Sequence, residues 1–301
     1  MSRKLKIYPN IDNGLNLVGS APSKLKLKSN SSTAFITEWA VPTGSFTFPL
    51  KSGNTYNCVI DWGDGTLVSN VTSSSDPNAI HYYTAGTYQI KITGVFTSIY
   101  VNNGSVKTYL KKVIQWGNVG FTTFNAAFFG CSNLNHLPNG PITGIGTLEA
   151  NTFQNCFYFC SALNTIPSGL FDNCTTADRF GSCFGYCSAL TYIPSGLFDN
   201  NTDIYDFGGC FKATAITAIP SGLFDNNTAI TNFYECFAEC VSLTAIPSGL
   251  FNNNILATQF NLCFRGTGIT SIPSGLFKSR EYFFLLKFSI SLIIGVKISV
   301  S

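Results

Sequence analysis

The feature that most constrains this chain is an internal repeat that fills its second half. The hexapeptide Ile-Pro-Ser-Gly-Leu-Phe occurs five times, at intervals of 27, 26, 27 and 26 residues. A weaker copy, Leu137-Pro138-Asn139-Gly140, precedes the five. A second block, Phe-x-x-Cys-Phe, separates successive hexapeptides. Units of this length cannot bury their apolar positions alone, so we expect them to stack and to align equivalent side chains in columns.

Each unit contains signals for a strand, two turns and a helical turn. Leu190–Pro194 and its equivalents are expected to form a short strand that the proline ends. Ser-Gly is expected to turn the chain, and the Asp-Asn-Asn-Thr type of segment to form a polar turn. Phe-x-x-Cys-Phe is expected to add one helical turn. The period, with Leu or Ile at fixed offsets, is typical of a leucine-rich-repeat solenoid, here of about six units.

Nine of the eleven cysteines fall in two columns of the repeat. The first column consists of Cys156, Cys183, Cys210, Cys236 and Cys263, and the second of Cys131, Cys160, Cys187 and Cys240. Ala or Thr replaces Cys at some equivalent positions, which indicates a site that needs a small side chain. We predict a structural ladder of free, buried cysteines without a metal or another cofactor. Metal ligation and disulfides are the alternative interpretations.

Residues 33–116 have a different texture, with short alternating runs separated by turn signals. Tyr56–Trp62 leads into the turn Gly63-Asp64-Gly65, and two further runs flank Ala85-Gly86. This spacing predicts a β-sandwich. Asp64 is expected to bond turn amides, and its proximity to Asp61 leaves calcium binding as the alternative.

The composition argues against catalysis and nucleic-acid binding. Charged residues make up 11% of the chain, and it has two histidines. Residues 31–277 hold 8 basic and 13 acidic residues, a mildly acidic balance that does not favour a nucleic-acid surface. The serines of the repeat recur in every unit, whereas a nucleophile would be singular. Carboxylates such as Asp206 and Glu235 occupy different repeat positions, so we expect no enzyme.

The two ends differ from the body. Residues 1–32 are interpreted as a basic N-terminal arm, and no apolar stretch there resembles a signal peptide. Residues 280–301 are interpreted as an apolar cap on the last repeat or as an aberrant tail, with possible self-association through it. Their longest apolar run is too short to span a membrane. We therefore expect four segments, 1–32, 33–116, 117–279 and 280–301, with Trp116 sealing the central junction.

Two motif sets carry a resemblance to known families. The pattern Phe-x-x-Cys-Phe with Leu-Thr-x-Ile-Pro-x-Gly-Leu-Phe, over about 117–279, resembles the BspA-type leucine-rich repeats of surface proteins. Asp61-Trp62-Gly63-Asp64-Gly65 with His81-x-Tyr83 resembles the polycystic-kidney-disease (PKD) type of immunoglobulin-like module. The resemblance implies a cell-surface or extracellular adhesin that binds a host protein or glycan.

Variation between units suggests where such a ligand would bind. The aromatic or Arg residues outside the repeat consensus are Arg179, Tyr186, Tyr192, Tyr205 and Tyr234. These residue types dominate binding hot spots, so they are the predicted ligand-binding residues. The lack of a recognisable signal peptide and the thiol-rich core favour an alternative, a phage virion or tail-associated protein. A structural spacer without any ligand is the third possibility.

Overall fold

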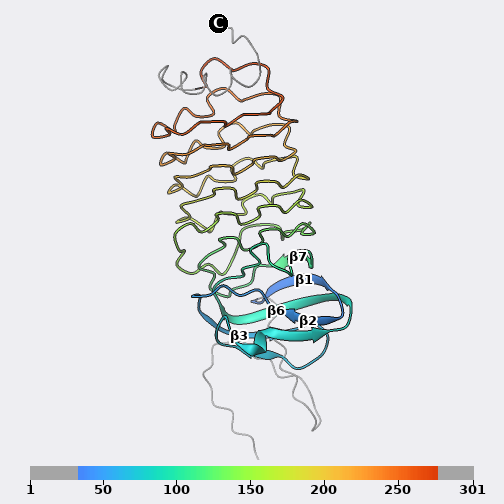
Figure 1. Cartoon of the computed structure of the whole chain (residues 1–301). Helices are drawn as coiled ribbons and strands as arrows, with labels where there is room; N and C mark the ends of the chain where they lie inside the picture. The colour runs from blue at the N-terminus through green and yellow to red at the C-terminus, as the bar shows by residue number, and fades with distance from the viewer. Residues whose placement is uncertain (1–32, 277–301) are drawn as a thin grey trace, which may run out of the picture.

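The computed structural model describes residues 33–276, and they are mainly β with almost no helix. The expectations for the basic arm at 1–32 and for the tail at 280–301 lie outside these residues. Sheet strands occupy the N-terminal part, and successive coils of the repeat are stacked on them (Figure 1). The elements are β1 (Phe35–Val41), β2 (Gly44–Thr47), β3 (Tyr56–Asp61), β4 (Ser69–Val71), the 3-10 helix η1 (Pro77–Ala79), β5 (Ile80–Tyr83), β6 (Gly86–Phe96) and β7 (Leu110–Gln115).

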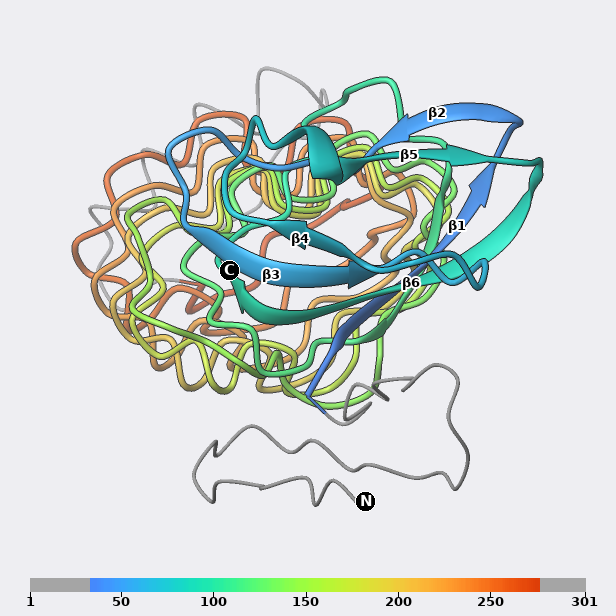
Figure 2. The ribbon, with the colours of Figure 1, turned by 90° about the horizontal axis from the view of Figure 1, so that it is seen from below.

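The strands form two antiparallel sheets. Five of them lie in the order β4-β3-β6-β1-β7, and β2 pairs with β5 in the second sheet. Figure 2 shows these strands lying across one end of the coils. The turn at Ala85-Gly86 joins β5 to β6, which belong to different sheets. The two predicted runs beside this turn are therefore strands, but they do not pair with each other.

Aromatic side chains fill the space between the two sheets. Trp39 from β1 and Trp62 after β3 are both buried, and Phe46 from β2 meets both rings edge-on. Beside them, the Asp64 carboxylate accepts hydrogen bonds from the Thr66 amide at 3.0 Å and from the Thr66 hydroxyl at 2.6 Å. Asp64 thus organises its own turn, as predicted.

The repeat units stack through three columns of phenylalanine rings. Phe128, Phe157, Phe184, Phe211, Phe237 and Phe264 form one column, with centroids 5.2–5.7 Å apart and ring planes within 11°. The first phenylalanines of the blocks form a second column, and the phenylalanines of the hexapeptides pack against it. The rings account for the strict recurrence of Phe in the sequence.

The inter-coil hydrogen bonds lie in a different segment from the one predicted. Alternate amides of the Phe-x-x-Cys-Phe block donate to the next coil, for example Phe153 to the Arg179 carbonyl at 3.2 Å and Phe157 to the Cys183 carbonyl at 2.8 Å. Parallel bridges join Arg179, Asp206, Asn232 and Gln259 just before the blocks. The prediction of a strand over Leu190–Pro194 is wrong, because no strand forms there and its proline cannot donate.

The predicted helical turn of Phe-x-x-Cys-Phe is also wrong. The residue before the cysteine has a left-handed backbone, with φ of 55° at Asn155 and 61° at Leu262. The Cys156 amide donates to the Phe153 carbonyl, and the Cys160 amide donates to that of Phe157. Two consecutive β-turns therefore replace the helix, since a left-handed residue interrupts it.

The polar turn after each hexapeptide holds a column of buried asparagines. Asn227 Nδ2 donates to the carbonyls of Phe198 and Asn201, at 3.0 and 2.8 Å. Asn201 and Asn254 make the same pair of bonds one coil earlier and one coil later. The side chains satisfy backbone carbonyls that no strand pairing reaches, so they connect the coils at this corner.

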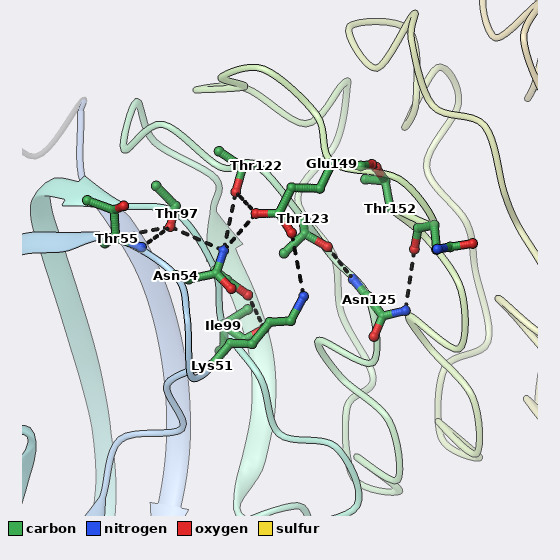
Figure 3. A network of polar contacts seen from close by, with 12 residues as sticks. Lys51, Asn54, Thr55, Thr97, Ile99, Thr122, Thr123, Asn125, Glu149 and Thr152 are labelled. Atoms are coloured by element: carbon green, nitrogen blue, oxygen red, sulfur yellow. Dashed lines mark hydrogen bonds and ion pairs between the residues drawn. The ribbon is translucent and has the colours of Figure 1, made fainter. Parts of the chain in front are cut away.

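The sheets and the coils share one hydrophobic core. Trp116 is buried at the junction, where its ring stacks on Phe35 and meets Phe124 edge-on. Figure 3 shows the polar contacts that close the same junction. Asn54 Nδ2 donates to Glu149 Oε1 at 2.9 Å, and Lys51 Nζ lies 3.7 Å from Glu149 Oε2. The first coils are thus attached to the sheets by both packing and charge.

Candidate binding surface

The five predicted ligand-binding residues do not form one site. Tyr192 is 62% exposed. It lies in the Leu-Thr-Tyr-Ile-Pro segment, which is separate in the sequence from the Phe-x-x-Cys-Phe blocks. Tyr234 is also exposed, and its amide donates to Asn232 Oδ1 at 2.8 Å. Arg179 and Tyr205 lie together, whereas Tyr186 belongs to another cluster.

Arg179 belongs to a polar ladder, which we define as Asn151, Arg179, Asp206 and Asn232. Its Nε donates to Asp206 Oδ2 at 2.6 Å, and its Nη1 donates to Asn151 Oδ1 at 2.9 Å. The guanidinium also lies 5.9 Å from the centroid of the Tyr205 ring. Two directional contacts and a cation–π contact thus engage Arg179 within the chain.

Asp206 is the centre of the polar ladder. Its side chain is 5% exposed, and its Oδ1 accepts from the Gly208 amide and from Asn232 Nδ2, both at 2.7 Å. A buried carboxylate needs such partners, because an unpaired charge in the interior is strongly destabilising. This arrangement stabilises the stacking of coils, and it leaves little of Arg179 and Asp206 for a ligand.

Tyr186 lies in a cluster of four rings, which we call the aromatic patch: Phe129, Tyr158, Phe159 and Tyr186. The Phe159 and Tyr186 rings stack at 4.5 Å, and Tyr158 meets Phe159 edge-on at 4.7 Å. The Phe129 ring belongs to the preceding coil, and its centroid lies 5.2 Å from that of Tyr158. Phe159 is 43% exposed and the other three rings are partly exposed, so this cluster lies at the surface and outside the core columns.

Two of these rings are held on an unfavourable backbone. Phe159 and Tyr186 both have φ of 60°, a conformation that costs an L-residue about 1–2 kcal/mol. Glycine occupies the same repeat position at Gly130 and Gly266, where it avoids this cost. A pair of stacked rings returns only about 0.5–1.5 kcal/mol. Ala213 and Glu239 have the same left-handed backbone at this position, with φ of 54° and 62°, so the repeat imposes the conformation and only the surface rings are particular to Phe159 and Tyr186.

The patch continues into charged residues on the next coils. Lys212 Nζ lies 6.0 Å from the centroid of the Tyr186 ring and 2.6 Å from Glu235 Oε2. Desolvation lowers the pKa of Lys212, but the hydrogen bond to Glu235 and the charges of Glu235 and Tyr186 together raise it above the usual value. Lys212 therefore stays protonated beside the rings.

All eleven cysteines are free and buried. In the second column, the thiols of Cys160, Cys187 and Cys240 donate to carbonyls of the preceding coil at 3.0–3.2 Å. Burial raises the pKa of the thiols in both columns, and it raises the pKa of Cys58 and Cys174 to about 12. These groups are therefore protonated at neutral pH, and their surroundings do not activate them as nucleophiles.

Two further properties concern residues 33–276 alone. Within them, no three His, Cys, Asp or Glu side chains are grouped so that they could hold a metal ion. Nor does this part of the chain contain a helix with the length and hydrophobicity needed to cross a membrane.

Of the aromatic patch, only Tyr186 was predicted from the sequence, without its neighbours Phe129, Tyr158 and Phe159. A signal for them was present, because the two residues after Phe-x-x-Cys-Phe include an aromatic ring in three consecutive units.

Comparisons with known proteins give little guidance. No protein-family model matches the chain, and no curated protein matches it. Among solved structures, it is similar to a chain in the complex of Toll and Spätzle from Drosophila, with 17% identity and a TM-score of 0.26. That similarity covers 50% of this chain and 22% of the other, so this chain matches about a fifth of the solved one.

Proposed function

We propose that this chain is a non-enzymatic recognition protein that binds a host or cell-surface macromolecule through the aromatic patch. The observation that carries the proposal is the placement of Phe159 and Tyr186. Both rings lie at the surface and stack on each other at 4.5 Å, at a repeat position where other units have Gly, Ala or Glu. Aromatic side chains fixed in advance lose little conformational entropy on binding.

The finer description of the fold belongs to the same proposal. The stacked phenylalanine columns support a leucine-rich-repeat solenoid of the BspA type, and the two antiparallel sheets support a PKD-like sandwich before it. With these modules the protein would act as an adhesin at a cell surface. The carboxylates considered for catalysis support binding over hydrolysis, because Asp206 pairs with Arg179 and Glu235 pairs with Lys212.

A binding screen tests this function. The full chain would be applied to an array of glycans and a panel of extracellular-matrix proteins, beside Tyr186→Ala and the control Tyr192→Ala. Saturable binding that Tyr186→Ala weakens and Tyr192→Ala leaves intact supports recognition through the patch. Absence of binding to every probe contradicts it.

A phage virion or tail-associated protein is the second candidate. It is favoured by the eleven free, buried thiols, which suit folding and assembly in a reducing compartment. Recovery of the chain in purified virus particles, measured by mass spectrometry, would support this setting, and its absence from such particles would contradict it.

A further inference from the structure

We infer that the aromatic patch binds an uncharged glycan chain, an inference that rests on the proposed recognition function. The rings form a row along the stacking direction, with one or two from each coil. Phe129 and Tyr158 lie 5.2 Å apart, and Tyr158 and Tyr186 lie 5.5 Å apart. This spacing is comparable to one sugar unit of an extended pyranose chain. Phe159 stacks on Tyr186, and Lys212 lies over the Tyr186 ring, so the row presents mainly ring edges to solvent. The apolar C–H groups of a pyranose ring can pack against these exposed ring atoms.

The residues next to the rings in the sequence are mainly polar and uncharged. Asn155 and Ser182 lie two residues before the second phenylalanine of their blocks, and Ser161 and Ser188 follow the rings. All four side chains are at least partly exposed. A narrow apolar row with neighbouring amide and hydroxyl groups suits a ligand that has apolar ring faces and hydroxyl edges.

Most charges beyond the rings are paired. Lys212 pairs with Glu235 at 2.6 Å, and Arg265 pairs with Glu239 at 2.5 Å. Lys107 lies beside Gly130 at the other end of the patch, so three cations and two anions leave one positive charge, a weak net field for attracting an acidic ligand. Their oxygen and nitrogen atoms can still exchange hydrogen bonds with sugar hydroxyls. The balance favours a neutral glycan over a sulfated or sialylated one.

A protein partner fits this surface less well. Stable protein interfaces bury about 800 Å² on each partner, and their centres are depleted of charged residues. Here the ion pair of Lys212 and Glu235 directly adjoins Tyr186. A protein ligand is therefore an alternative outcome of the test.

The experiment measures binding of soluble oligosaccharides to the full chain by isothermal titration calorimetry. The neutral probes are cellohexaose, mannohexaose and N-acetylchitohexaose, and a heparin-derived hexasaccharide is the anionic probe. Phe159→Gly and Tyr186→Gly are the test variants, because each removes a ring and also relieves the left-handed backbone. Tyr192→Ala removes an exposed ring outside the patch and is the matched control.

We expect at least one neutral hexasaccharide to bind, and each glycine variant to bind it about tenfold more weakly or worse, the loss for about one stacking contact. The melting temperature of the variants should be unchanged or higher, since the strain is relieved. A merely structural role of the rings would instead lower the melting temperature. Tyr192→Ala should bind like the parent chain.

Three results would overturn the glycan inference, and they separate it from the proposed function. Binding of the heparin fragment alone refutes a neutral ligand. Neutral-glycan binding that survives both glycine variants refutes the site. Binding to a matrix protein without any glycan binding refutes the ligand class but leaves recognition standing, whereas no binding to any glycan or protein probe refutes both.

Discussion

The ring of Tyr158 lies over Gly185 of the following coil, where an added methyl group would come within 2.8 Å of a ring carbon. Gly185 therefore makes room for one ring of the aromatic patch. Gly185→Ala should displace Tyr158 and cost about 1–3 kcal/mol of unfolding free energy, the usual range for overpacking. Urea denaturation measures this cost. In a Tyr158→Ala background the clash with the ring is absent and only the Gly209 carbonyl oxygen, 3.2 Å from the added methyl group, stays close. The same substitution should then cost less, and an equal cost in both backgrounds would contradict the contact.

The buried asparagine column gives a second prediction, with a control one residue away. Asn227→Ala removes the side-chain donor of the Asn201 carbonyl, whereas the Phe198 carbonyl keeps its bond from the Asn201 amide. It should lower the free energy of unfolding by about 1–3 kcal/mol, the cost of one unsatisfied buried group. Asn226 is exposed and makes one bond of 3.3 Å, so Asn226→Ala should stay within about 0.5 kcal/mol of the parent chain. Equal effects in denaturation experiments would argue against a structural column.

The polar ladder predicts that Asp206 acts in stability. Asp206→Ala removes the partner of Arg179 and the acceptor of the Gly208 amide, and should cost about 3–5 kcal/mol. Asp203, an exposed carboxylate of the same unit, is the control, and Asp203→Ala should have almost no effect. Thermal melts compare the two variants. If Asp206→Ala melted like Asp203→Ala, the pair with Arg179 would contribute nothing.

The buried thiols predict a loss of stability at alkaline pH. Burial raises the pKa of the Cys183 thiol and of its column neighbours above that of an unfolded thiol, about 8.5. Well below pH 8.5 the thiols keep their protons in both the folded and the unfolded state, so these groups add no pH dependence to stability there. Above it, the unfolded state alone loses protons, so each buried thiol lowers the free energy of unfolding by about 1.4 kcal/mol per pH unit.

Urea unfolding between pH 7 and pH 10 measures this slope. Cys183→Ala should reduce the pH dependence of the unfolding free energy by the contribution of one thiol. An unchanged pH dependence would contradict the burial of this thiol as its cause. The native protein should also react slowly with a thiol reagent at pH 8, whereas all eleven thiols should react after unfolding.

Recurrence in the sequence predicted the packing columns better than the backbone. The positions of Phe157 and Phe184 in equivalent places of two units were enough to predict that they align. The spacing of Phe-x-x-Cys-Phe, however, suits a helical turn as well as two β-turns, and the left-handed φ of Asn155 is not visible in that pattern. The inter-coil hydrogen bonds were predicted in the wrong segment for a related reason. Backbone pairing depends on which segments of neighbouring coils approach each other, and the alternation of apolar residues does not show which segments these are.

The spatial arrangement of the predicted surface residues depends on the columns to which they belong. Arg179 was selected because it departs from the consensus, but Asp206 and Asn232 occupy the same place in the next two units. Read as a column, the three side chains predict mutual hydrogen bonds rather than a free surface. Tyr186 was identified without Phe159, because its partner ring is contributed by another coil.

The direction of the inter-coil hydrogen bonds has a mechanical consequence. These bonds, such as that from the Phe157 amide to the Cys183 carbonyl, connect one coil to the next along the stack. A pulling force applied between the two ends of the stack would act along the bonds and break them one coil at a time. The molecule would then lengthen in steps, each releasing one unit of 26 or 27 residues, and would yield gradually under tension where a laterally loaded sheet would resist and then break at once.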